Sequence, residues 1–467
     1  MSVFEKAKAI YNEFEKAGMI NRSYPPPKDS KYYNPKIETL SREELNKLKN
    51  KNLRMVVKWA YENSKFYRRW FEKAEVKPED IKGYDDLVKL PILRKEDLRK
   101  DQVENPPYGS MVVEDMLPYV TSVWTTSGTT GRPTIHPWTD LEWDLLVEWC
   151  ARHAWTAGLR PGYVFYNLFP AGRLYIYGPA FYEASKRCGA KVLQVGSENF
   201  LADVEGWTRF MGEFEDNYVS MTTPILLIRI GETLKKLGKT SPYVALQPGG
   251  MPLTPRMKEK LRELHPRVGE NIFNIAGNVE GYSSCECEAH EGRHFWEDIT
   301  MVEVLDPKTG ERVSEGERGE LVITQLYLLT LPLIRYSLGD IIENTITYEK
   351  CKCGRTHGRF LEVLPGRLRD MVTVKGKQFL PFDVEQVVAT LPDTTSLYQL
   401  VIEADVMDTL KVRVETTRKI PDSEYEAMVK RTLERELGVP VEVELIPPGT
   451  VPIVGYKAKN VLDLRKK

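Results

Sequence analysis

The sequence predicts an α/β protein with a large N-terminal domain and a small α+β domain at its C-terminus. Between Val120 and about Glu362, short β-rich runs alternate with amphipathic helical segments. This alternation favours layers of sheet and helix over an all-α or all-β fold. After Gly366-Arg367 about a hundred residues remain, which is enough for a separate small domain. A length of 467 residues agrees with two or three domains.

We expect three parts along the chain. Residues 1–105 form a helical, charged N-terminal layer of the large domain, residues 106–366 form its α/β core, and residues 367–467 form the small domain, here called the lid. Ser41 and Glu44 have the spacing of a capping box, which opens a helix in the N-terminal layer. Further helices are expected at residues 140–157, 255–265, 382–391 and 422–437, and strands at residues 164–168, 191–195, 272–275, 400–404 and 410–415.

The charge and hydropathy of the chain exclude several classes of protein. The formal net charge is −1, so the chain lacks the basic excess expected of a nucleic-acid-binding surface. It has no run of eighteen apolar residues, so we expect no transmembrane helix. The first six residues are too polar for a signal peptide. We therefore expect a cytoplasmic protein that acts on small molecules, with no nucleic-acid or membrane partner. A homodimer is compatible with the sequence.

A run rich in hydroxyl groups and glycine indicates a phosphate-binding loop. It comprises Thr126, Ser127, Gly128, Thr129, Thr130 and Gly131, and it lies between a β-rich segment and the helix expected from Asp140. Glycine lets the backbone approach an anion closely, and hydroxyls and exposed amides can surround phosphate oxygens. The pattern G-x-x-x-x-G-K-[ST] is absent, so this is not the common phosphate loop. A flexible linker is the alternative for such a composition.

Several motifs in order resemble one enzyme family. The hydroxyl-rich run, the segment from Pro332 to Asp340, the pair Gly366-Arg367 and the segment from Gly455 to Asp463 are similar to motifs of the phenylacetate–CoA ligases, in the adenylate-forming superfamily. The segment from Tyr33 to Leu45 resembles the start of those enzymes. The resemblance implies the architecture of that superfamily and an AMP-forming aryl-CoA ligase. Such an enzyme uses ATP, Mg²⁺ and coenzyme A to convert an aromatic carboxylate into aryl-CoA through an acyl-adenylate.

The resemblance also implies roles for residues that would contact the nucleotide. Asp340 and Arg367 would bind the ribose, a role that suits a carboxylate because it accepts both hydroxyl hydrogen bonds. The adenine-side segment places Gly249 and Gly250 against the base. Glu280 would be the ligand for Mg²⁺, which in such sites takes few carboxylates plus substrate oxygens. Another alignment puts Gly277 at that position, and a surface glutamate in a turn is the alternative for Glu280.

Three further assignments follow from the same resemblance. Lys457 would be the catalytic lysine, with Lys459 as its rival, because an ammonium there can offset the charge that develops in the transition state. Arg369 would lie at the hinge about which the lid rotates. Aromatic and small residues would line a flat pocket for the acid, namely Tyr166, Phe169, Ala171 and Gly172.

The cysteines form two close pairs that indicate a structural zinc site. Four of the six cysteines lie at Cys285, Cys287, Cys351 and Cys353, and His294 follows the first pair. Thiolates and imidazole in a set of four are typical of structural zinc. By the register of some family members the ligands would be Cys287, His294, Cys351 and Cys353. Cys285, His290 and His357 remain as substitutes, and buried free thiols are the alternative.

Two other functions remain open from the sequence. One is an adenylyltransferase of the coenzyme F390 synthetase type, which stops after transferring AMP. The other is a zinc-stabilised nucleotide-binding regulator that has lost its chemistry. This possibility is raised by Met251, Ala276 and Leu338, which replace residues common in the family.

Overall fold

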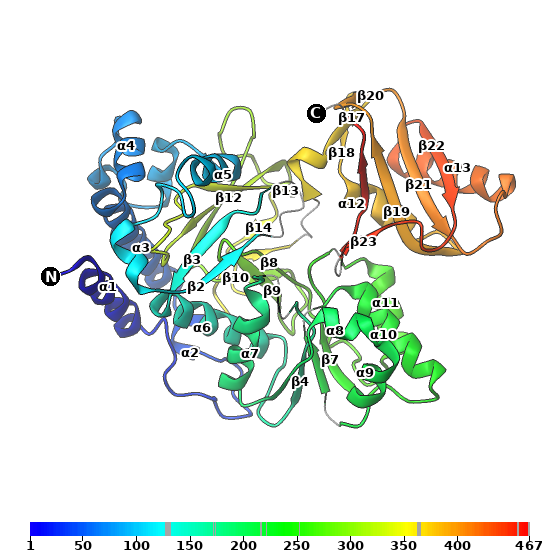
Figure 1. The fold of residues 1–467 in the computed structure, drawn as a ribbon, viewed down its shortest axis with the longest axis horizontal. Helices are drawn as coiled ribbons and strands as arrows, with labels where there is room; N and C mark the ends of the chain where they lie inside the picture. Colours follow the sequence, from blue (N-terminus) through cyan, green and yellow to red (C-terminus); the bar gives the residue numbers. More distant parts are fainter. Residues whose placement is uncertain are drawn as a thin grey trace.

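The chain folds as a large domain with a smaller lid seated on it (Figure 1). The computed structural model describes residues 1–126, 132–170, 172, 174–214, 217–220, 222–251, 253–361, 366–454 and 457–465. Sheets and helices are mixed throughout, so the predicted α/β class is confirmed. None of the described helices is both long and apolar enough to span a membrane.

The N-terminal layer is helical and packs on the core of the large domain. Its main helices are α1 (Val3–Ala17), α3 (Arg42–Asn63), α4 (Lys65–Lys73) and α5 (Lys95–Glu104), with the short α2 (Pro35–Glu38) between the first two. The predicted capping box is present, since Ser41 Oγ accepts from Glu44 N at 3.2 Å and Ser41 N donates to Glu44 Oε2 at 3.1 Å. The layer also supplies strand β1 (Leu93–Arg94), which pairs in parallel with β13 of the core.

A four-stranded parallel sheet forms one part of the core, in the order β5-β4-β6-β7. Its strands are β4 (Val164–Asn167), β5 (Lys191–Gln194), β6 (Asn217–Ser220) and β7 (Tyr243–Gln247), joined through α7 (Tyr177–Arg187), α8 (Ser197–Ala202), α9 (Val204–Met211) and α10 (Pro224–Lys236). Helix α11 (Pro255–Leu264) follows β7, and α6 (Asp140–Thr156) precedes β4. Strand–helix–strand connections of this kind are what the alternating sequence pattern predicted.

Two mainly antiparallel sheets complete the large domain. One has the order β1-β13-β12-β11, and its long strands are β11 (Thr300–Leu305), β12 (Arg318–Gln325) and β13 (Tyr336–Glu343). The other runs β14-β15-β10-β9-β8, with β14 (Ile346–Thr347), β15 (Arg359–Phe360), β10 (Arg293–Phe295), β9 (Ser283–Glu286) and β8 (Ile275–Gly277). A hairpin of β2 (Val120–Thr125) and β3 (Ile135–Thr139) stands apart from both sheets.

The expected strand at residues 272–275 is displaced. Regular pairing begins only at Ile275, where β8 starts. Before β8, Ile272 makes an isolated parallel bridge with Leu246, and Ile275 itself makes another with Gly249. An alternating hydrophobic pattern indicates an extended backbone. A β-ladder also requires a neighbouring strand in register, which the local sequence does not reveal.

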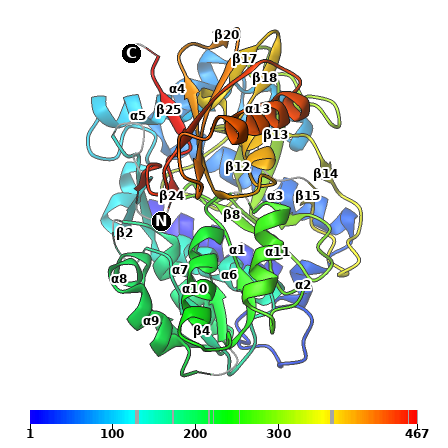
Figure 2. The ribbon, with the colours of Figure 1, turned by 90° about the vertical axis from the view of Figure 1, so that its right-hand side faces the viewer.

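The lid has a hydrophobic core of its own, from Val372 to Leu445. Its larger sheet has the order β22-β21-β19-β25 and its smaller sheet the order β18-β17-β20. The helices are α12 (Pro381–Val388) and α13 (Ser423–Leu437), and the strands are β17 (Val372–Val374), β18 (Lys377–Phe379), β19 (Thr394–Ile402), β20 (Val406–Met407), β21 (Leu410–Thr416), β22 (Val441–Ile446) and β25 (Val461–Asp463). A small hairpin, β23 (Ile453–Val454) with β24 (Lys457–Ala458), lies at the end of the lid that faces the large domain (Figures 1 and 2).

Candidate active site

The hairpin of β2 and β3 holds the two ends of the hydroxyl-rich run. Thr126 N donates to Thr134 O at 3.1 Å, and Thr134 N donates to Thr126 Oγ1 at 3.0 Å. These two bonds close the base of the loop directly after the last ladder pair, Thr125 with Ile135. Residues 127–131, which include the predicted Ser127, Gly128, Thr129, Thr130 and Gly131, lie outside the described residues. Their phosphate-binding role stays a prediction.

A neutral histidine lies beside this loop base. Thr134 Oγ1 and His136 Nε2 are 3.1 Å apart, within hydrogen-bonding distance. Burial lowers the pKa of His136 to about 4, so the ring is uncharged at neutral pH. The carboxylate of Glu280 is one of the charges that act on this ring, which places Glu280 near the base of the loop.

Glu280 is a buried carboxylate held by a lysine from the N-terminal layer. Its side chain is 1% exposed, and Lys95 Nζ lies 2.6 Å from Glu280 Oε1. Burial is the largest single effect and alone would raise the pKa of the Glu280 carboxyl. The attraction of Lys95 and His136, together with the hydrogen bonds to the carboxylate, outweighs burial and lowers the pKa to about 2. The next residue, Gly281, has φ +82°, and a Cβ there would meet the Tyr327 hydroxyl at 2.6 Å. Glu280 is therefore ionised and held in a tight turn, not displayed on the surface.

The competing alignment supplies no metal ligand. Gly277 has no side chain, and a Cβ built there would meet the Tyr177 hydroxyl at 2.8 Å. That hydroxyl donates to Asn278 O at 2.6 Å. Close packing against Tyr177 explains a glycine at this position, so Glu280 is the residue of the segment that offers a carboxylate.

Asp340 and Arg367 face each other across two paired strands. Asp340 of β13 is the register partner of Arg367 in the short strand β16 (Gly366–Arg367). Arg367 Nε lies 2.7 Å from Asp340 Oδ1, and Arg367 Nη1 donates to Leu338 O at 3.2 Å. The Asp340 carboxylate raises the pKa of Arg367, and Glu280 adds to this effect. The three charged side chains therefore lie within electrostatic reach of one another.

The two adenine-side glycines follow strand β7 at its carboxyl end. Gly249 N donates to Thr222 O at 3.0 Å, and a Cβ at Gly249 would meet Ile275 O at 2.7 Å. Gly250 has φ +78°, a conformation that favours glycine. Ligands of open α/β sheets bind beyond the carboxyl ends of the strands, which is where these glycines lie.

The predicted acid-pocket residues separate into two groups. Phe169 lies in a cluster of rings, with centroids 5.4 Å from Tyr175, 6.0 Å from Tyr177 and 5.8 Å from Phe181. Tyr166 lies in a different hydrophobic core, and its hydroxyl donates to Met211 O at 3.0 Å. The structure does not bring Tyr166 and Phe169 together. Gly172 is described as a bend in the chain, and Ala171 lies outside the described residues.

The predicted lysine segment lies in the lid, and the predicted hinge residue lies at its start. Lys457 lies in β24, where its backbone pairs with Val454 of β23. Lys459, its rival, is exposed, and Lys459 N donates to Pro452 O at 2.8 Å. Arg369 lies in a short 3-10 turn, Leu368–Asp370, directly after β16, and its carbonyl accepts from Arg465 Nη2 at 2.8 Å.

Four buried side chains form a compact cluster of soft ligands. Cys287, His294, Cys351 and Cys353 each place a ligand atom within 4.8 Å of the other three. Cys287 Sγ and Cys351 Sγ are 3.7 Å apart, and Cys353 Sγ and His294 Nε2 are 3.4 Å apart. Ligand sulfurs about 2.3 Å from a tetrahedral zinc would be about 3.8 Å from each other. The spacing is too long for a disulfide and fits a shared metal.

The three substitute ligands make other contacts. Cys285 Sγ accepts from Gln247 Nε2 at 3.2 Å. The His357 ring is held at both nitrogens, because Nδ1 accepts from Glu297 N at 3.0 Å and Nε2 lies 3.0 Å from Ile37 O. His290 stacks on Phe273.

The cluster is tied to the N-terminal layer. His294 Nδ1 lies 3.1 Å from His357 O, so Nδ1 is the donor and the Nε2 lone pair points to the cluster. The Tyr32 hydroxyl donates to Cys353 O at 3.0 Å. Arg355 Nε lies 2.7 Å from Glu38 Oε2, and neither side chain is exposed. The cysteine loop therefore anchors the segment before α3.

Comparison with known proteins supports a family assignment. A family model described as AMP-binding enzyme C-terminal domain matches residues 376–465. The phenylacetate-coenzyme A ligase of Thermus thermophilus is 32% identical over 458 residues, covering 93% of this chain and 100% of that enzyme. The chain belongs to the phenylacetate–CoA ligase family. The phenylacetate-coenzyme A ligase of Escherichia coli is 28% identical over 92% of this chain and 97% of its own length.

Solved structures of a related ligase show the same fold. A 2-hydroxyisobutyryl-CoA ligase in the postadenylation state, in complex with R3-HIB-AMP, has a TM-score of 0.83 and 27% identity, covering 95% of this chain and 94% of its own. The same ligase in its thioesterification state, with 2-HIB-AMP and CoA, has a TM-score of 0.67. This member of the phenylacetate–CoA ligase family is therefore an AMP-forming acid–thiol ligase with the predicted architecture.

Sequence reasoning missed Lys95, the partner of Glu280. Lys95 lies 185 residues from Glu280 along the chain and opens a helix of the N-terminal layer. A lysine at the start of a charged helix gives no local sign of a buried partner.

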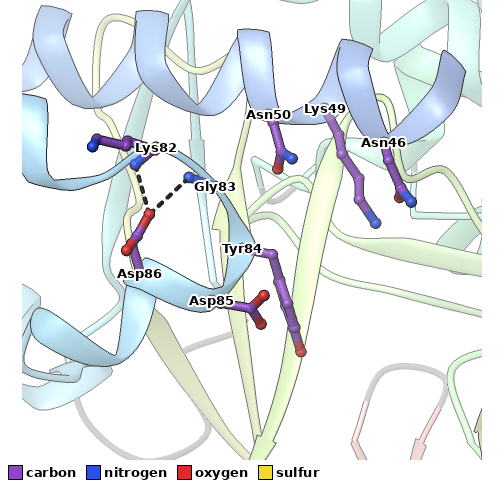
Figure 3. A pocket seen from close by; sticks show the side chains of 8 residues that line it. All are labelled: Asn46, Lys49, Asn50, Lys82, Gly83, Tyr84, Asp85 and Asp86. Carbon is purple, nitrogen blue, oxygen red and sulfur yellow. Dashed lines mark hydrogen bonds between the residues drawn. The ribbon is translucent and has the colours of Figure 1, made fainter. Parts of the chain in front are cut away.

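A surface hollow lies away from these residues, between α3 and residues 82–86, where the 3-10 helix Tyr84–Lys89 begins (Figure 3). Its volume is about 460 Å³, and Asn46, Lys49 and Asn50 reach from α3 toward Tyr84. None of the predicted site residues lines this hollow. Lys49 is already held by the buried Glu297 at 2.7 Å.

Proposed function

We propose that the protein converts an aryl carboxylate, ATP and coenzyme A into aryl-CoA, AMP and pyrophosphate through an aryl adenylate. A thiol cannot displace the oxygen of a free carboxylate, which is a poor leaving group, so activation as the adenylate must come first. The observation that carries this proposal is the grouping of Asp340, Arg367 and Glu280 beside the base of the hydroxyl-rich loop. Curated relatives named phenylacetate-coenzyme A ligase support the aromatic acid.

In the first half-reaction the acid carboxylate attacks the α-phosphorus of ATP and pyrophosphate leaves. Asp340 accepts hydrogen bonds from the ribose hydroxyls, and Arg367, already fixed by Asp340, donates to the same region. Thr126 and the hydroxyl-rich residues after it would bind the phosphates, and Gly249 and Gly250 would let the adenine approach the backbone. Lys457 compensates the charge that develops between carboxylate and phosphate.

Glu280 would hold Mg²⁺, which offsets the charge of the triphosphate. The carboxylate is ionised and buried, as an oxygen ligand for this metal should be. The ammonium of Lys95 occupies Oε1, so the metal must compete with this cation or share the carboxylate with it.

In the second half-reaction the thiol of coenzyme A attacks the acyl carbon and AMP leaves. The lid would rotate about residues 366–370, so that a different face of the lid meets the large domain. Arg369 lies at this point of the chain, between strand β16 of the large domain and strand β17 of the lid.

The acid would bind against the rings around Phe169. The centroids of Phe169, Tyr175 and Tyr177 are 5.4–6.0 Å apart, so the rings pack on one another. Phe169 and Tyr177 are buried, and Tyr175 is half-buried. Aromatic faces of this kind favour a flat apolar acid.

The cluster of Cys287, His294, Cys351 and Cys353 would hold a structural zinc ion. It offers three sulfurs and one imidazole at zinc-like spacing, with a fixed histidine tautomer. The metal would stabilise the loop that anchors the N-terminal layer and would take no part in the reaction.

A pyrophosphate-release assay over a panel of acids tests this function. Phenylacetate, benzoate and substituted aryl acids should release pyrophosphate with ATP, and AMP release should then depend on coenzyme A. A preference for 2-hydroxyisobutyrate would refute the aromatic acid. Release of pyrophosphate with AMP transfer to another acceptor, independent of coenzyme A, would favour the adenylyltransferase alternative.

A further inference from the structure

One ion pair joins the large domain to the lid across their interface. Arg318, at the start of β12, faces Asp383 in the first turn of α12. Arg318 Nη2 lies 2.7 Å from Asp383 Oδ1, and Nη1 donates to Asp383 Oδ2 at 3.1 Å. The ion pair is bidentate, and the side chains of Arg318 and Asp383 are 29% and 16% exposed. Such a pair is stronger than a single contact in open solvent.

Each partner is also fixed within its own domain. Asp383 Oδ2 accepts from Leu380 N at 2.8 Å, which caps α12. Arg318 Nε donates to Glu343 Oε1 at 3.3 Å, and these two residues are register partners in neighbouring strands. Little side-chain freedom is lost when the pair forms, because both groups are already oriented.

The position of the pair relative to the hinge makes it sensitive to lid rotation. Arg367 is held to the large domain by Asp340, whereas the carbonyl of Arg369 is held by Arg465 of the lid. The change of domain therefore falls between residues 367 and 369. Asp383 lies on the lid side of this point and Arg318 on the other, so rotation separates them.

The lid position also matches one stage of a related ligase. The TM-score is 0.83 against the 2-hydroxyisobutyryl-CoA ligase in its postadenylation state, 0.69 against an open conformation and 0.67 against the thioesterification state. The Arg318–Asp383 contact thus occurs in the arrangement associated with acid activation.

We propose that the Arg318–Asp383 pair is a latch that holds the lid in the arrangement for adenylation and must open before the thioester step. This inference rests on the proposed two-step function. By this inference, an ion pair that lies outside the nucleotide site influences the relative rates of the two half-reactions.

Separate assays of the two half-reactions test the latch. Arg318→Gln should slow ATP–pyrophosphate exchange by about 3- to 30-fold, the effect expected from losing a partly buried, bidentate ion pair. Thioester formation from supplied aryl adenylate and coenzyme A should be unchanged or faster. Asp383→Asn keeps an oxygen to cap α12 and should act in the same way. The matched control is Glu343→Gln, which removes a charge beside Arg318 but keeps the oxygen that accepts from Arg318 Nε, so Arg318 stays oriented and exchange should be unchanged.

A double variant and a distance measurement complete the test. Arg318→Gln with Asp383→Asn should be no slower than either single variant, because one interaction is lost in each case. Spin labels at Lys100→Cys on α5 and Lys430→Cys on α13, both exposed positions in a chain whose own six cysteines are buried, report the lid position without turnover. Arg318→Gln should broaden the distance distribution.

The outcomes separate the latch from the proposed function. Equal slowing of both half-reactions, additive effects in the double variant, or an unchanged distance distribution in Arg318→Gln would each overturn the latch. Wild-type protein that releases no pyrophosphate with any acid would refute the proposed function, and the spin-label result would still decide whether the pair holds the lid.

Discussion

The ion pair of Lys95 and Glu280 makes a quantitative prediction about stability. Lys95→Met would leave the buried Glu280 carboxylate without its counter-charge. Lys95 is the strongest of the effects that lower the pKa of Glu280, and the net lowering from 4.5 to about 2 corresponds to about 3 kcal/mol. For a large domain of this size the entropy of unfolding is about 0.8 kcal/mol per degree, so the loss corresponds to about 4 °C in melting temperature.

The pH dependence of this effect has a defined sign. The pKa of Glu280 is lowered on folding, so its stabilising contribution is present above pH 4.5 and is lost as pH falls toward 2. In Lys95→Met the attraction of the ammonium is lost, so burial raises the pKa of Glu280 above its wild-type value and the carboxyl takes up a proton more readily. The difference in melting temperature between wild type and variant should therefore be largest near pH 7 and should narrow as the pH is lowered.

Thermal unfolding by calorimetry, at several pH values, measures the effect. The matched control is Lys65→Met, which removes the exposed pair with Glu114 and should shift the transition by about 1 °C or less. Lys95→Met combined with Glu280→Gln should melt higher than Lys95→Met alone, since no buried charge is left unpaired. A Lys95→Met protein that melts within a degree of wild type at pH 7 would refute this account of the pair.

Three further predictions concern the metal, the ribose and the lysine. Purified protein should contain about one zinc ion per chain. The variant Cys351→Ser should lose the metal and melt at a lower temperature, whereas Cys150→Ser should keep the metal. A wild-type protein that contains no metal and keeps its melting temperature would contradict the site. Asp340→Ala should raise the KM for ATP and lower turnover, at a cost of about 1.5–3 kcal/mol, and unchanged ATP kinetics would reject the ribose assignment. Lys457→Ala should slow adenylation by roughly 10²–10³ while sparing thioester formation from supplied aryl adenylate. Loss of adenylation in Lys459→Ala instead would move the lysine assignment by two residues.

Much of the fold could be predicted from the sequence because its signals are local. The capping box at Ser41 and Glu44 depends on residues three positions apart, and the helix that follows it is where the pattern predicts. Helix α13 begins and ends within a residue of its predicted bounds for the same reason. Where a strand needs a distant partner, as at residues 272–275, the local pattern placed the ladder three residues too early.

The motifs also named most of the charged residues at the candidate site, but not how they meet. Asp340 and Arg367 were assigned one by one, and their ion pair follows from the register of β13 with β16. The sequence offered seven candidate zinc ligands. Only the structure, in which β9, β10 and the loop at Cys351 lie together, reduced them to the four side chains that form the cluster.

By itself the sequence determined the α/β class, the two-domain order and the family motifs, since these are properties of residues near one another along the chain. Only the tertiary structure decided that Lys95 neutralises Glu280, that Tyr166 lies apart from Phe169, and that Arg318 meets Asp383. The two ion pairs join residues 185 and 65 positions apart along the chain, and Tyr166 and Phe169 lie in different hydrophobic cores. Whether such residues meet depends on the path of the chain and on the register of its strands. Burial then strengthens a charge pair, because the interaction is stronger where water is excluded.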